Sequence, residues 1–191
     1  MLYRVFSHVP GSRADPFSVA RHFQGGGRHD GPEHYTALYL AREPISAVAE
    51  RIQGFRGQHL TGTVFTRPDG RIDALAAIDD EGWPPLIDLD DPHVLAARGI
   101  RPSTVATGDR PTTQRSALAL FNEGATGLAW WSTLEAAWIN VTVFAERLPP
   151  ELRRVASVEP LTIAHPVVRL AAEHLLIGLP PTRPRLRALP A

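Results

Sequence analysis

The chain has 191 residues, which fits one domain large enough to bury a hydrophobic core. Its 20 basic residues balance its 20 acidic residues, and this zero net charge argues against a general electrostatic affinity for nucleic acid or for an anionic membrane. The absence of cysteine excludes disulfides, thiol nucleophiles and cysteine-ligated metal sites. There is no signal-peptide pattern and no apolar segment of membrane-spanning length, so we expect a cytoplasmic protein.

The beginning of the chain predicts a strand and a helical turn. Hydrophobic alternation indicates the strand over residues 2–9, in which Leu2, Arg4 and Phe6 share one face. The helical turn is expected within residues 15–23, immediately before a run of three glycines.

A loop, a strand and a helix follow in the next 30 residues. The loop opens with Gly25-Gly26-Gly27-Arg28, and the clearest strand of the sequence covers residues 35–41. A helix begins at Pro44, because proline at the first helical position gives up no hydrogen bond. Its apolar residues recur at helical spacing and form one stripe, which consists of Ile45, Val48, Ala49 and Ile52. Glu50 lies beside that stripe, and Gly54 and Gly57 end the helix.

The rest of the chain predicts short strands mixed with helices. Residues 61–66 and 71–78 are expected as strands around a hairpin turn at Asp69-Gly70, followed by short strands and loops with one brief helix near 94–98. A helix over 113–123 is expected to be capped by Thr112 or Thr113 and ended by Gly124. The last elements are strands over 127–132, 140–145 and 155–161 and a helix over 166–177.

These elements predict an α+β fold: a single domain of mixed short strands with flanking helices. We assign residues 1–179 to the domain and residues 180–191 to a proline- and arginine-rich tail that we expect to be poorly ordered.

The candidates for a functional site are four side chains, those of Arg28, Tyr39, Glu50 and Ser132. A glycine run lets a backbone approach a ligand closely, and an arginine beside it can hold a phosphate with two hydrogen bonds, so Gly26, Gly27 and Arg28 predict an anion site. Tyr39 and Tyr35 share a strand face, and either could line a pocket with Glu50 at its wall. Taken singly, each has an ordinary explanation as a solvent-facing loop arginine, a packed tyrosine or a surface carboxylate.

Ser132 is a candidate for hydrogen bonding and not for attack on a substrate. It follows two tryptophans at the end of a strand, outside any G-x-S-x-G context. The eight histidines do not fall at metal-ligand spacing, so no metal site is expected.

The order and spacing of Arg28, Tyr39, Glu50 and Ser132 resemble the RES domain, a family named for its arginine, glutamate and serine. The likeness extends over most of the chain in short segments: Leu2-Tyr3-Arg4-Val5, Gly26-Gly27-Arg28, Ala37-Leu38-Tyr39-Leu40, Ala47-Val48-Ala49-Glu50, Leu86-Ile87-Asp88-Leu89, Pro111-Thr112-Thr113-Gln114, Gly127-Leu128-Ala129-Trp130-Trp131-Ser132 and Asn140-Val141-Thr142-Val143-Phe144. Two departures are present, since His29-Asp30 stand where the family usually has an aromatic residue and asparagine, and Thr133-Leu134 stand where a small residue and arginine are common.

The resemblance implies an ADP-ribosyltransferase-like fold and a toxin that consumes NAD⁺. NAD⁺ would be a substrate, with inorganic phosphate or water as co-substrate and no bound cofactor or metal. The catalytic residues would be Arg28, Glu50 and Ser132, and the substrate would contact Gly26, Gly27, Arg28, Tyr39 and Ser132. The expected partner is a cognate antitoxin with a helix-turn-helix DNA-binding part, and a homo-oligomer is compatible with the sequence.

Two other classes of function stay open at this point. One is a mono-ADP-ribosyltransferase that uses the same four residues to modify a protein. The other is a non-catalytic binding module that has kept the fold, for which the departures at His29 and Asp30 are the main argument. The acceptor of the ADP-ribose group is not determined by the sequence.

Overall fold

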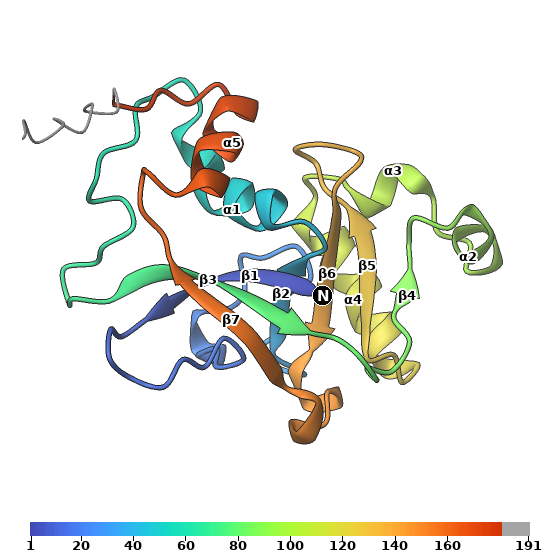
Figure 1. The fold of residues 1–191 in the computed structure, drawn as a ribbon. Helices are drawn as coiled ribbons and strands as arrows, with labels where there is room; N and C mark the ends of the chain where they lie inside the picture. The colour runs from blue at the N-terminus through green and yellow to red at the C-terminus, as the bar shows by residue number, and fades with distance from the viewer. Residues whose placement is uncertain (181–191) are drawn as a thin grey trace, which may run out of the picture.

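Seven strands pair in the order β4-β5-β6-β2-β1-β3-β7 in residues 1–180, the part of the chain that the computed structural model describes (Figure 1). Neighbouring strands are antiparallel except for β4 and β5, which are parallel. The strands are β1 (Leu2–His8), β2 (Ala37–Ala41), β3 (Ile72–Asp79), β4 (Ile87–Asp88), β5 (Gly127–Trp131), β6 (Ile139–Phe144) and β7 (Arg154–Pro160).

Five α-helices and four short 3₁₀ turns accompany the sheet in the described residues. The α-helices are α1 (Pro44–Ile52), α2 (Pro92–Ala97), α3 (Pro102–Val105), α4 (Arg110–Asn122) and α5 (Pro166–His174). The 3₁₀ turns are Arg21–Phe23, Gln53–Phe55, Ala145–Arg147 and Pro150–Leu152. None of the described helices is long and apolar enough to cross a bilayer. This mixture of short strands and flanking helices confirms the predicted α+β fold.

The sheet is divided in its middle, between β1 and β2. Within the described residues these strands pair at a single position, Tyr3 with Ala41, whereas β1 pairs with β3 at seven positions and β2 with β6 at five. Figure 1 shows β1 and β3 running across the direction of β5 and β6. The sheet is therefore two half-sheets, β4-β5-β6-β2 and β1-β3-β7, that meet at one point and leave a gap beside it.

Each half-sheet has its own helical layer. The apolar stripe of α1 is buried as predicted, since Val48, Ala49 and Ile52 are fully buried in a core that they share with Val168 and Ala171 of α5. Figure 1 shows α1 and α5 side by side over β1 and β3. Behind the other half-sheet, α4 packs against β5 and β6 in a separate core. A third core joins the two half-sheets, since Leu2 and Phe6 of β1 pack in it with Leu38 and Leu40 of β2.

The strand predicted over residues 61–66 is wrong. This segment folds into consecutive turns, in which Val64 N donates to Thr61 O and Thr66 N donates to Thr63 O. Only Thr66 makes a ladder contact, an isolated bridge with Ile72, while Phe65 is buried in the core. Local hydrogen bonds around Gly62 replace the strand ladder that the β-branched residues favour.

Two predicted helix limits also need correction. Helix α4 begins at Arg110 and is capped by Asp109, whose side chain accepts from Thr112 N, so the threonines at 112 and 113 lie inside the helix. Helix α5 ends at His174 and not at 177, because Leu176 takes a left-handed conformation with φ of 57°. Gly178 then pairs with the chain near His59. Helix α3 was not predicted, and most of the predicted tail, residues 181–191, lies outside the described residues.

Candidate active site

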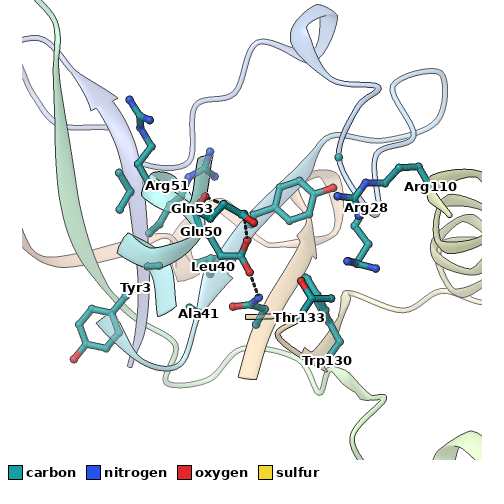
Figure 2. A pocket seen from close by; sticks show the side chains of 16 residues that line it. Tyr3, Arg28, Leu40, Ala41, Glu50, Arg51, Gln53, Arg110, Trp130 and Thr133 are labelled. Carbon is teal, nitrogen blue, oxygen red and sulfur yellow. Dashed lines mark hydrogen bonds between the residues drawn. The ribbon is translucent and has the colours of Figure 1, made fainter. Parts of the chain in front are cut away.

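A cavity of about 340 Å³ lies at the gap between the two half-sheets (Figure 2). Its volume is within the range of small-molecule sites, and its wall combines apolar side chains with a few charged ones. The lining residues are Tyr3, Arg4, Val5, Gly27, Arg28, Tyr39, Leu40, Ala41, Ala47, Glu50, Arg51, Gln53, Arg110, Trp130, Thr133 and Asn140. Because β1 and β2 separate after one pair, side chains from both strands and from α1 reach the same space.

The carboxylate of Glu50 is held by three side chains from three elements. Its Oε1 accepts a hydrogen bond from Ser132 Oγ at 3.0 Å and another from Asn140 Nδ2 at 2.9 Å. Its Oε2 accepts from Gln53 Nε2 at 2.8 Å, one turn further along the chain. Hydrogen bonds from neutral donors fix the orientation of the carboxylate without neutralising its charge.

The donors to Glu50 are themselves fixed and buried. Asn140 is 4% exposed, and its Oδ1 accepts from the buried Ser46 hydroxyl at 2.9 Å, which sets the amide so that Nδ2 faces Glu50. Ser132 is 2% exposed, and its Oγ accepts from Leu134 N at 3.1 Å. Ser132 is not among the residues that line the cavity, so in this structure it supports Glu50 and does not face the open space.

Arg28 is anchored to the far side of the cavity. Its Nη1 donates to the carbonyl oxygens of Thr107 and, at 3.4 Å, Val105, and its guanidinium carbon lies 4.9 Å from the centre of the Trp130 ring. Burial, and then the nearby charge of Arg110, lower the pKa of Arg28 from its ordinary value, while Glu50 opposes that shift. The remaining donors of this fixed guanidinium are available to an anion in the cavity.

Two of the three glycine amides in the loop, those of Gly25 and Gly27, bind Asp30. Gly25 N and Gly27 N both donate to Asp30 Oδ2, at 2.7 Å each. A Cβ on Gly27 would lie 2.5 Å from both Asp30 Oδ1 and the Tyr39 hydroxyl, so glycine is required there by close contact. Gly26 does not line the cavity. The loop is therefore closed by an internal carboxylate that occupies the Gly25 and Gly27 amides, and a phosphate contact at Gly26 and Gly27 stays a prediction.

The structure distinguishes the two tyrosines that we expected to share a strand face, since Tyr39 lies in β2 and Tyr35 precedes it. Tyr39 lines the cavity, and its hydroxyl accepts from His29 N at 2.8 Å and donates to Asp30 Oδ1 at 2.7 Å. Burial, and then the charge of Asp30, raise the pKa of Tyr39, so it remains a neutral phenol. Tyr35 is fully buried, donates to His29 O at 2.9 Å, and packs against Phe121 and Phe144.

His29 is a buried structural residue between these groups. Its Nδ1 lies 2.8 Å from Thr142 Oγ1, and its ring meets the Trp130 ring edge-on at 5.1 Å between centres. Burial, and then the charges of Arg28 and Arg110, lower the pKa of His29 to about 3. The imidazole is therefore neutral at physiological pH and lies behind the cavity wall, against the rings of Tyr39 and Trp130.

The cavity has more positive than negative charge. Figure 2 shows Arg28 and Arg110 on one side, with Glu50 and Gln53 across from them. Arg51 also lines the space, but its Nε donates to the buried Asp73 at 2.6 Å, which offsets its charge. The arrangement of a cationic side opposite a single oriented carboxylate suits a ligand with anionic phosphates at one end.

Several lining residues were missed by the sequence analysis. Asn140 is one of them, and Thr142, which contacts His29 and does not line the cavity, is a second polar position in the same otherwise apolar strand. The two are two residues apart and therefore on one face, which was a usable signal. Arg4 similarly interrupts the apolar face formed by Leu2 and Phe6. Arg110 is the first residue of α4, and no sequence pattern around it indicated that it lines a cavity. No group of three or more potential metal ligands occurs within residues 1–180.

Comparisons with known proteins agree with this architecture. The model of the RES domain matches residues 1–165. Among solved structures, the crystal structure of the M. tuberculosis MbcT–MbcA toxin–antitoxin complex contains a similar chain, with a TM-score of 0.63 and 19% sequence identity over 92% of this chain and 88% of that one. At that identity the similarity shows a shared fold. No curated protein matches the sequence.

Proposed function

The chain belongs to the RES domain family, and from this premise we propose that it is a toxin-like enzyme that cleaves the nicotinamide–ribose bond of NAD⁺. The observation that carries the proposal is the Glu50 carboxylate, which is oriented by Ser132, Asn140 and Gln53 in a cavity whose opposite side contains Arg28 and Arg110. This arrangement matches the charges of NAD⁺, whose diphosphate is anionic and whose nicotinamide ring is cationic.

Binding begins with the diphosphate. The guanidinium of Arg28 is fixed by two carbonyl oxygens and by Trp130, so little side-chain entropy is lost when it binds a phosphate oxygen. Arg110 adds a second positive charge on the same side. With the diphosphate held there, the ribose and nicotinamide extend across the cavity towards Glu50.

Cleavage is assisted by electrostatic stabilisation. As the bond between ribose C1″ and the ring nitrogen breaks, its electron pair moves to the nicotinamide, which leaves as a neutral molecule and needs no proton. Positive charge develops on the ribose, and a carboxylate held in advance stabilises that charge without reorganising. Glu50 also has the position to orient an attacking oxygen or to accept its proton.

Tyr39 and Ser132 support this chemistry in different ways. The Tyr39 hydroxyl is engaged by His29 and Asp30, so its aromatic ring is the part that can orient the nicotinamide. Ser132 acts through Glu50, because its hydroxyl donates to that carboxylate and is buried. By the family resemblance, the acceptor that we propose is water or inorganic phosphate.

We also propose a protein partner that covers the cavity. The similar solved chain is part of a toxin–antitoxin complex, and an enzyme that depletes NAD⁺ requires control in the cell that makes it. By the family resemblance, this partner is an antitoxin with a helix-turn-helix DNA-binding part.

The proposal is tested with purified protein and NAD⁺, by measuring free nicotinamide and the loss of NAD⁺ over time. We expect activity in the wild type, loss of at least about a hundredfold in Glu50→Gln, and no change in Glu151→Gln, which makes the same substitution at an exposed site on another part of the surface. Nicotinamide release that requires an added protein acceptor would support a mono-ADP-ribosyltransferase. No turnover by a folded wild type under any of these conditions would refute the proposal.

A further inference from the structure

The loop between β5 and β6, residues 132–138, connects the site to a helix outside the cavity. Both strands belong to the half-sheet β4-β5-β6-β2. Leu134 and Trp138 of the loop nevertheless pack in the core over the other half-sheet, with Val168 and Ala171 of α5. Figure 1 shows the loop at the same end of the molecule as α5. The loop is therefore held by a helix whose residues are not part of the cavity wall.

Trp138 is the large apolar side chain that the loop places against α5. It is 8% exposed, and its ring centre lies 4.5 Å from that of His174, with an angle of 40° between the ring planes. His174 Nε2 also lies 3.7 Å from Glu135 Oε2 of the loop, but both of these side chains are partly exposed, so solvent weakens the ion pair. Burial of a tryptophan removes a large apolar area from water. The main anchor of the loop is therefore Trp138.

The backbone of Trp138 fixes Ser132. The Trp138 carbonyl oxygen accepts a hydrogen bond from Ser132 N at 2.7 Å, and Trp138 N donates to Glu135 O at 3.0 Å. Ser132 Oγ accepts from Leu134 N at 3.1 Å and donates to Glu50 Oε1 at 3.0 Å. A displacement of Trp138 from α5 would therefore move the hydroxyl that orients the Glu50 carboxylate.

We propose that Trp138 is a positioning residue for the active site, which acts on Glu50 through Ser132. The assignment rests on the catalytic role proposed above for Glu50. A carboxylate stabilises a developing positive charge best when its orientation is fixed before the reaction, so a loosened loop slows turnover and leaves substrate affinity nearly unchanged. Helix α5 thereby contributes to catalysis without lining the cavity.

Steady-state kinetics of NAD⁺ cleavage test the assignment. We expect Trp138→Leu to lower kcat by roughly tenfold, about the effect of losing one hydrogen bond to a charged group, with little change in KM. The matched control Trp83→Leu, at a partly buried tryptophan outside the cavity, should leave kcat unchanged. In a Ser132→Ala background, Trp138→Leu should lower kcat by less than about twofold, because it acts through that hydroxyl. An equal loss in both backgrounds would overturn the proposal.

Amide hydrogen exchange measures the anchor without NAD⁺. In Trp138→Leu the amides of Ser132 and Leu134 should exchange about tenfold faster than in the wild type, while those of Val141 and Val143 in β6 keep their rates. Unchanged exchange at Ser132 and Leu134 would also overturn the proposal. Faster exchange at these amides in a protein that cleaves no NAD⁺ would support the anchor and count against the proposed function, so the two can fail separately.

Trp138→Phe covers the case in which Trp138→Leu does not fold. It keeps an aromatic ring against His174 but buries less apolar area. We expect changes in kcat and in the exchange of the Ser132 and Leu134 amides in the same direction as for Trp138→Leu, and smaller.

Discussion

Asn140 donates a hydrogen bond of 2.9 Å from Nδ2 to Oε1 of Glu50, across 90 positions of sequence. The contact is possible because β6 pairs with β2 so that Asn140 lies opposite Ala41, three residues before α1 begins. The strand pairing thus brings a buried amide to the helix that carries the carboxylate. In the proposed mechanism the orientation of Glu50 depends on this pairing.

Removing either donor to Glu50 Oε1 should reduce turnover more than substrate binding. Hydrogen bonds to a charged group contribute about 1.5–3 kcal/mol, so Asn140→Ala and Ser132→Ala should each lower kcat by roughly tenfold to 150-fold. Because both donors act on one oxygen, the double variant should lose less than the product of the two single effects. Steady-state kinetics of the three variants measure this coupling. Strictly multiplicative losses would show that the two donors act independently.

Adjacent glycines in the loop should respond differently to alanine. In Gly27→Ala the new Cβ would lie 2.5 Å from Asp30 Oδ1 and from the Tyr39 hydroxyl, so the free energy of unfolding should fall by about 1–3 kcal/mol. In Gly26→Ala the Cβ meets nothing within 4 Å, and stability should be unchanged or slightly higher. Urea denaturation of both variants measures the difference. Equal stability of the two would contradict the packing described for this loop.

His29 should make the protein less stable in mild acid. Its pKa is about 3 in the folded protein and about 6.5 when unfolded, so between these values the unfolded chain binds the additional proton. This contribution to stability is complete above pH 6.5 and is lost as pH falls, by about 1.4 kcal/mol per pH unit, or about 2 kcal/mol at pH 5.

The measurement compares wild type with His29→Gln, which can still bond to Thr142 but does not titrate. We expect the free energy of unfolding to fall less between pH 7 and pH 5 in the variant than in the wild type. If both lose the same amount, His29 is not the group responsible.

Lysine should not replace arginine at position 28. It would keep the charge but could not maintain the contacts with Val105, Thr107 and Trp130 while presenting donors to the cavity. We expect Arg28→Lys to raise the KM for NAD⁺ by about tenfold or more. Arg110 is exposed and begins its helix without such contacts in the described residues, so Arg110→Lys should change KM much less. Similar KM values for the two variants would count against the anchoring of Arg28.

The elements that carry the site were predictable where the signal was local. The apolar stripe of α1 and the proline at its start identify the helix of Glu50, and alternation identifies β2. The turns at residues 61–66 were not predictable in this way, because β-branched residues there favour a strand while the chain forms local hydrogen bonds around a buried Phe65. Here tertiary packing outweighs propensity.

The hydrogen-bond and packing partners of the site residues could not be predicted from the sequence, for a different reason. That Asp30, and not a ligand, accepts from the glycine amides depends on the path of one loop, which no periodicity describes. The contacts of Glu50 with Ser132 and Asn140 depend on which strands pair. The choice between Tyr35 and Tyr39 likewise depended on α4, whose Phe121 covers Tyr35.

The single pair between Tyr3 and Ala41 has a consequence for how the empty and occupied protein differ. A ligand in the gap touches β1 on one side and β2 and α1 on the other, so its contacts add bridges between half-sheets that the backbone joins at one place. A bound ligand should therefore stabilise the two half-sheets relative to each other. Backbone amides of β1 and β2 that face the gap should exchange with solvent more slowly when the cavity is filled, although they lie in the centre of the sheet.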